Sequence, residues 1–203
     1  MTPMVDLFSL LLTFFMLTAT FRPQEAVVVE TPKSISDVNT PDKNVMTLTI
    51  SKNNKVYFDM DNGPDSTTRF RSILLDYLGK RYNIQFTPVE FERFVKLSSF
   101  GLPINNMKTW LDAPNQAKRD EIQQVLEKQG IDGIPMDSTK NELKDWILYA
   151  RSINPNMVVS IKGDQDADYA TVKKVLDILQ ENKVSKFNLT TNLVKVDVKM
   201  DEQ

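Results

Sequence analysis

The chain has 203 residues, of which 41% are hydrophobic and 26% are charged, a balance typical of a folded protein rather than a disordered one. Its formal net charge of −2 gives no electrostatic reason to expect a nucleic-acid partner. Cysteine and histidine are both absent, which excludes disulfides, cysteine nucleophiles, Ser-His-Asp triads and metal sites built from these residues. We therefore expect no enzyme, no cofactor and no metal site.

The first predicted element is an apolar segment that contains one acid. Residues 7–21 carry no charge, Asp6 precedes them, and Arg22 begins a polar stop. Counted from Met4, the run has about 18 residues. A helix of this length is about 27 Å long, close to the roughly 30 Å of a membrane's hydrocarbon core.

Three interpretations of this segment compete. A signal peptide requires a basic region at its start, and no Lys or Arg precedes the run. A buried core helix requires a partner, whereas this run is apolar on nearly every face. We therefore favour a transmembrane helix over residues 1–21. Because the basic residues that would set its orientation are missing, we expect the cytoplasmic start to lie upstream of Met1.

The polar residues of the segment lie on one predicted helical stripe. Asp6, Ser9, Thr13 and Thr20 are separated by three, four and seven residues, and Thr18 falls off the stripe. Such a stripe points into a helix bundle or a water-filled path, because polar groups are unfavourable against lipid. Asp6 is then either a proton-carrying acid or a charge at a helix N-terminus.

A linker and a hairpin follow. Residues 22–44 contain three prolines and read as an extended linker with a brief strand at 27–29. Residues 46–58 alternate between apolar and polar side chains around Asn53-Asn54, which predicts a β-hairpin.

The middle of the chain is predicted to be mainly helical, with Trp110 and Trp146 in its core. Thr139 and Glu142 form a capping-box pattern, and Gly130 is a helix stop. The predicted helical segments are 65–82, 88–100, 113–130 and 138–153. Residues 59–65 superficially resemble a calcium loop, but the remaining EF-hand ligands are missing, so we expect a solvated turn.

The last third predicts a strand, a helix and a second strand. Residues 157–161 are a short apolar run, and apolar side chains recur at helical spacing from Tyr169 to Leu179. Asp164 or Asp166 is expected to cap or turn the chain before this helix. The final strand is expected at 184–191, and residues 193–199 are a further strand or a tail.

The apolar segment resembles the single transmembrane helix of the ExbD/TolR family, subunits of proton-driven motors that energise outer-membrane transport. Pro3, Asp6 and the ending Phe-Met-Leu-Thr-Ala-Thr fit the family's pattern. The resemblance implies that Asp6 is the carboxyl group that gains and loses a proton. It implies also that Ser9, Thr13 and Thr20 line the proton path.

The resemblance further implies an α+β fold with a small mixed sheet packed by helices. The expected domains are the transmembrane helix 1–21, the linker 22–44 and a periplasmic domain 45–203, with a helical insertion at about 60–137. The implied location is the inner membrane, with a single span and a periplasmic C-terminal domain. The implied partners are an ExbB/TolQ-like polytopic protein, a TonB-like energy transducer, membrane lipid and a second copy of the chain.

Three functions remain open at this point. The first is an ExbD-like subunit that uses the proton motive force to energise TonB-dependent transport. The second is a membrane-anchored binding module, for example with TolR-like binding to the cell wall, in which the helix is only a tether. The third is a soluble enzyme behind a signal peptide.

Overall fold

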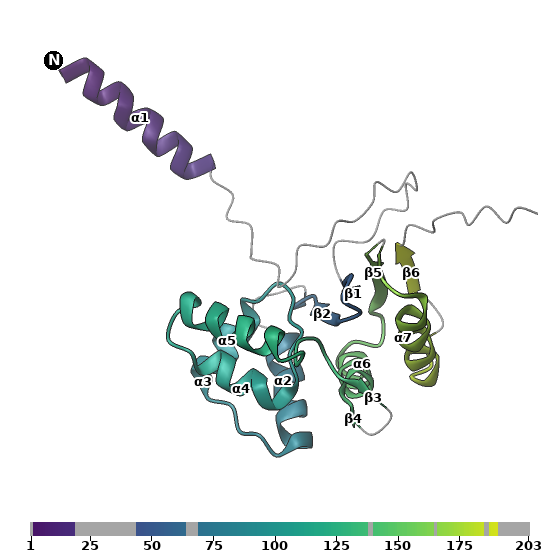
Figure 1. Ribbon diagram of the computed structural model, residues 1–203. Coiled ribbons are helices and arrows are strands. Elements are labelled where there is room, and N and C mark those ends of the chain that lie inside the picture. The colour runs from purple at the N-terminus through teal and green to yellow at the C-terminus, as the bar shows by residue number, and fades with distance from the viewer. Residues whose placement is uncertain are drawn as a thin grey trace, which may run out of the picture.

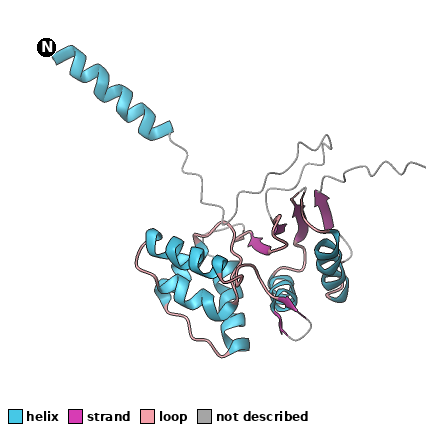
Figure 2. Ribbon diagram, in the orientation of Figure 1, coloured by secondary structure: helices cyan, strands magenta, loops and turns pink. Residues whose placement is uncertain are grey.

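The computed structural model describes residues 2–18, 44–63, 69–137, 140–164, 166–184 and 187–190 (Figures 1 and 2). It has seven helices and six strands within these residues. The helices are α1 (Thr2–Thr18), α2 (Phe70–Tyr82), α3 (Pro88–Val95), α4 (Ile104–Asp112), α5 (Gln116–Lys128), α6 (Glu142–Ile153) and α7 (Tyr169–Glu181). The strands are β1 (Val45–Ile50), β2 (Val56–Met60), β3 (Met136–Asp137), β4 (Lys140–Asn141), β5 (Val158–Gly163) and β6 (Phe187–Thr190).

Four of the strands form one mixed sheet in the order β2-β1-β5-β6. β1 and β2 are antiparallel, whereas β1 with β5 and β5 with β6 are parallel. The predicted hairpin is confirmed, and Asn54 provides the left-handed backbone of its turn (φ 60°). The strand–helix–strand unit β5-α7-β6 is confirmed as well. The fold is therefore α+β with a small mixed sheet, as the sequence predicts.

One face of the sheet carries the core. Side chains at alternate positions of β1 and β2 are buried on this face, and Leu48 pairs in register with Phe58 on β2 and Ile161 on β5. Trp146 of α6 packs on this face, with its ring centroid 4.7 Å from that of Phe100 and 5.6 Å from that of Phe58. Both predicted core tryptophans, Trp110 and Trp146, are buried.

The described part of residues 60–137 is mainly helical, as predicted, and α2–α5 gather beside the β2 side of the sheet (Figure 1). They return to the sheet at its β2 edge, where Phe100 and Phe58 exchange backbone hydrogen bonds of 2.7 and 2.9 Å. The N–H of Ile134 also donates to the carbonyl of Val56 at 2.9 Å. These bonds occupy the edge of β2, so the helical segment and the sheet form one packed body.

Several predicted details are wrong. Helix α6 has Asn141 as its N-cap, and the Asn141 side chain accepts from the N–H of Lys144, so the predicted start at Thr139 does not hold. Helix α7 is capped by Asp168 rather than by Asp164 or Asp166. Its first residue, Tyr169, is exposed instead of facing the core.

Other details are confirmed or were not anticipated. Gly130 ends α5 with φ 70°, as predicted. Helix α4 was not predicted. A complete capping box occurs at the start of α3, where Thr87 and Glu90 each bond the other's backbone N–H. The predicted strands at 27–29 and 193–199, together with most of the linker 22–44, lie outside the described residues.

Candidate functional site

The candidate site lies on α1, a 17-residue helix whose described side chains are all exposed. Asp6 is the only charged residue of this helix. At about 100° of rotation per residue, Asp6, Ser9 and Thr13 fall within a sector of about 60°. The structure therefore brings these three predicted site residues onto one face. The fourth, Thr20, lies outside the described residues.

Asp6 lies in the second turn of α1, because the helix begins at Thr2 and its first turn contains no acid. The attraction between a carboxylate and the positive end of a helix falls off within the first turn. The two interpretations of Asp6, a proton-carrying acid and a charge that stabilises the helix N-terminus, both stay predictions.

The hydroxyl of Thr13 forms hydrogen bonds within its own helix. It donates to the carbonyl oxygens of Ser9 and Leu10, at 3.0 and 2.9 Å. A hydroxyl that bonds the preceding turn satisfies its donor locally and keeps its oxygen free to accept. Thr13 can therefore accept a hydrogen bond from a water molecule or from a neighbouring chain. Ser9 lies one helical turn nearer to Asp6 than Thr13 does.

An exposed apolar surface of α1 borders the polar stripe. It consists of Leu7, Leu10, Leu11, Phe14 and Leu17, and Thr13 lies beside it. The polar and apolar surfaces of α1 are thus adjacent, and one neighbouring chain could contact both.

The length and composition of a helix determine whether it could cross a membrane. Within the described ranges, the structure contains no helix that is both long enough and apolar enough to cross a membrane.

The acids near the end of β2 take structural roles. The carboxylate of Asp61 accepts from the backbone N–H of Asn44 at 2.8 Å, and Asp59 pairs with the guanidinium of Arg71. Asp65 lies outside the described residues. No cluster of three or more acids within the described part of the chain is arranged to hold a metal ion.

Arg71 is a buried arginine that no pattern in the sequence indicates. Its side chain is 9% exposed, and it donates to the carbonyl oxygens of Met60, Leu97 and Ser98 as well as to Asp59. Burial lowers the pKa of Arg71, and Asp59 opposes this effect. The guanidinium therefore joins β2, α2 and the end of α3, because its fork of donors reaches all three.

Glu142 is a second buried charged group. Its carboxylate accepts from the backbone N–H of Ile104 at 2.8 Å, so it satisfies a donor at the start of α4. Burial raises the pKa of Glu142, and the hydrogen bond from Ile104 opposes the rise. Glu142 therefore joins α4 and α6.

The side chain of Asp164, the acid at the end of β5, bonds within its own turn, and its backbone N–H bonds across to the end of β1. Its side chain accepts from the N–H of Asp166 at 3.1 Å, and its own N–H donates to the carbonyl of Ile50 at 2.9 Å. This is the turn that the sequence predicts.

Comparison with known protein families gives a match. A family model described as the biopolymer transport protein ExbD/TolR matches residues 1–87 and 89–193. No curated protein and no solved structure matches the chain. The matched residues include the whole of α1 and nearly all of the α+β body.

Proposed function

The chain belongs to the ExbD/TolR family of biopolymer transport proteins, and on this premise we propose that it is an inner-membrane motor subunit that uses the proton motive force through Asp6. In this proposal it energises TonB-dependent transport across the outer membrane, as ExbD does. The observation that carries the proposal is the position of Asp6, the one charged residue of α1, on a stripe with Ser9 and Thr13.

The proposal assigns residues 1–21 to a membrane span. Helix α1 is about 25 Å long at 1.5 Å per residue, shorter than a hydrocarbon core of about 30 Å. The sequence adds Ala19, Thr20 and Phe21 before the first following charge, Arg22. The apolar side chains around α1 then face lipid or a polytopic partner of the ExbB/TolQ type.

The working step is a change of charge at Asp6. A carboxylate enclosed by apolar partner helices is costly, and protonation removes this cost. The neutral helix can move past the next face of the partner, and release of the proton on the other side restores the charge and holds the helix in place. One proton that crosses the full potential supplies about 2.3 kcal/mol per 100 mV.

Ser9 and Thr13 have different parts in this step. Ser9 is one helical turn from Asp6 and is proposed to hold the water that exchanges its proton. Thr13, whose proton is bonded to the carbonyls of Ser9 and Leu10, can only accept from that water. Thr20 is proposed to extend the path at its other end.

The remaining parts transmit the motion. The linker 22–44 is proposed to connect α1 to a periplasmic α+β body, which contacts a TonB-like transducer. The family works with paired copies, and we propose a homodimer. Because the helical segment occupies the edge of β2, the outer edge of β6 is where another strand could pair within the described sheet.

A second candidate function uses the helix only as a tether for a binding module, for example one with TolR-like binding to the cell wall. The observation that favours a binding module, without identifying its ligand, is a cavity of about 480 Å³ between α2 and α3. A tether does not require an acid at position 6. The two functions therefore differ in what they predict for Asp6.

The test is the replacement Asp6→Asn in cells that lack the native copy, with Asp6→Glu as the matched acid. The motor proposal expects Asp6→Asn to abolish transport that depends on the proton motive force, at normal membrane abundance. It expects Asp6→Glu to keep part of the transport. Full activity of Asp6→Asn at the same abundance would leave only the tether.

A further inference from the structure

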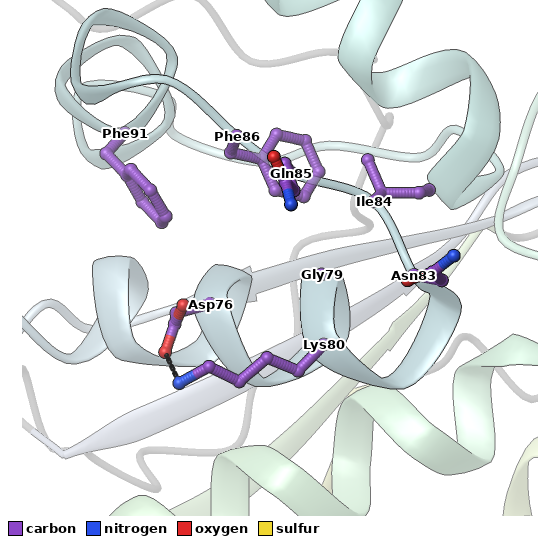
Figure 3. A pocket seen from close by; sticks show the side chains of 8 residues that line it. All are labelled: Asp76, Gly79, Lys80, Asn83, Ile84, Gln85, Phe86 and Phe91. Carbon is purple, nitrogen blue, oxygen red and sulfur yellow. Dashed lines mark hydrogen bonds and ion pairs between the residues drawn. The ribbon is translucent and has the colours of Figure 1, made fainter.

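A cavity between α2 and α3 is lined by charged, amide and aromatic side chains. It has a volume of about 480 Å³, within the range of small binding sites. The side chains that line it come from the C-terminal half of α2, the connection to α3 and α3 itself (Figure 3). They are Asp76, Gly79, Lys80, Asn83, Ile84, Gln85, Phe86 and Phe91.

One wall of this cavity, residues 84–86, is held in place before any ligand arrives. The N–H of Ile84 donates to the carbonyl of Gly79 at 2.8 Å. A Cβ at Gly79 would lie 2.7 Å from the Ile84 carbonyl oxygen, so only glycine permits this close approach. The ammonium of Lys108 donates to the carbonyl of Gln85 at 2.6 Å and lies 5.7 Å from the centre of the Phe86 ring.

The start of α3, which supplies Phe91 to the cavity, is fixed as well. Thr87 and Glu90 form the capping box, and Glu90 is 1% exposed while it pairs with Lys108 at 3.3 Å. Both segments are therefore held by internal hydrogen bonds, and a preformed site binds with less loss of conformational entropy.

The phenyl rings in the cavity form a socket. The Phe86 and Phe91 rings meet edge to face, with centroids 6.1 Å apart and planes at 66°. The two rings contact each other, and the angle that they form offers the face of one ring and the edge of the other to one apolar side chain. Both rings are only partly buried, so the socket is open to an incoming group.

The rim of the socket carries amide groups that the protein does not use. The side chains of Asn83 and Gln85 are exposed and make no hydrogen bond to the described part of the chain. A primary amide both donates and accepts, as a peptide group does. Asp76 and Lys80 pair with each other at 2.6 Å on α2 (Figure 3), and at 45% and 70% exposure both are accessible to a charged ligand.

We propose that this cavity binds an extended peptide segment of a partner protein. One bulky apolar side chain of the peptide packs in the angle that the Phe86 and Phe91 rings form, and Asn83 and Gln85 bond the main chain of the peptide. The inference does not depend on Asp6 or on the motor function, because it concerns recognition by the α2–α3 region alone.

The test is NMR titration of the full chain in detergent, with Ac-Ala-Leu-Ala-NH2, Ac-Ala-Phe-Ala-NH2 and Ac-Ala-Ala-Ala-NH2 as probes. The amide of Gly79 and the side-chain amide of Gln85 report binding. The leucine and phenylalanine peptides are expected to bind with dissociation constants of about 1 mM and at least about tenfold more tightly than the alanine peptide. The disaccharide of N-acetylglucosamine is titrated in the same way.

Variants separate the socket from the rim. Asn83→Gly keeps the left-handed backbone at φ 56°, and together with Gln85→Ala it should weaken the leucine peptide about fivefold. Phe91→Ala should remove the preference for leucine over alanine, and Val89→Ala, on the same helix but outside the cavity, should change nothing. The proposal is overturned by absence of saturable binding, by equal binding of all three peptides, or by saturable binding of the disaccharide alone. It is also overturned when Asn83→Gly with Gln85→Ala binds as the native chain does.

Discussion

Arg71 and Asp59 form an ion pair in which the guanidinium is 9% exposed and the carboxylate 38% exposed. The same guanidinium donates to three backbone carbonyls, so it satisfies groups on both sides of the junction between the sheet and the helical segment. Removal of a buried, fully bonded charge leaves its partners unsatisfied, which costs more than the pair itself contributes.

The first prediction concerns this junction. Arg71→Met is expected to lower the free energy of unfolding by about 2–4 kcal/mol, measured by urea denaturation of the α+β body within the full chain. Arg81→Met is the control on the same helix, because Arg81 is 60% exposed and its pair with Asp145 spans 3.6 Å. The control should cost at most about 1 kcal/mol. Equal effects of both variants would contradict the role assigned to Arg71.

The second prediction concerns the start of α6. Asn141→Ala is expected to cost about 1 kcal/mol of unfolding free energy, because the Asn141 side chain accepts from the N–H of Lys144 at 3.1 Å. Thr139→Ala should cost clearly less. A larger loss of unfolding free energy for Thr139→Ala than for Asn141→Ala would instead support the capping box that the sequence alone predicts.

The third prediction concerns pH. Burial raises the pKa of Glu142 above its ordinary value of 4.5, so the folded state binds this proton more tightly than the unfolded state does. The stability that Glu142 contributes is complete below its unfolded pKa and is lost as pH rises through its raised folded pKa. Glu142→Gln, which keeps an acceptor for Ile104, does not lose this contribution.

Relative to the native chain, Glu142→Gln should therefore gain unfolding free energy between about pH 4 and pH 7. Urea denaturation of both proteins across this range measures the difference, in which the titration of other acids cancels. A difference that stays constant or falls with pH would contradict the effect of burial.

The fourth prediction concerns the polar stripe of α1. Ser9→Ala is expected to slow transport driven by the proton motive force severalfold, because Ser9 is one turn from Asp6 on the same face. Thr18→Val is the matched loss of a hydroxyl off the stripe, and it should leave the rate unchanged. Equal transport rates for the two variants would contradict the proposal that the polar stripe lines the proton path.

The sequence predicts much of the fold because its signals there are local. The alternation around Asn53-Asn54 predicts the hairpin, and helical spacing places Trp146 in the core. Helix α4 escapes prediction, because Asn105 and Asn106 are poor helix formers and only tertiary packing stabilises that segment. The caps of α6 and α7 are misassigned because several Thr, Asn and Asp side chains compete near each start.

Some of the functional and buried polar residues could be predicted from local sequence spacing, and others could not. Asp6, Ser9 and Thr13 follow from spacing along one helix, which the sequence displays directly. Arg71 could not be found, because its partners lie 11 to 27 residues away and meet only in the folded chain. The socket of Phe86 and Phe91 depends likewise on how the α2–α3 connection folds back at Gly79.

The measurement that tests the central claim most directly is proton flux through the complex of this chain with its polytopic partner, reconstituted in vesicles with a pH-sensitive dye inside. Under an imposed potential, the native chain and Asp6→Glu should conduct protons, and Asp6→Asn should reduce the flux to that of vesicles without the chain. Flux through Asp6→Asn equal to that of the native chain would contradict the assignment of Asp6 as the proton carrier.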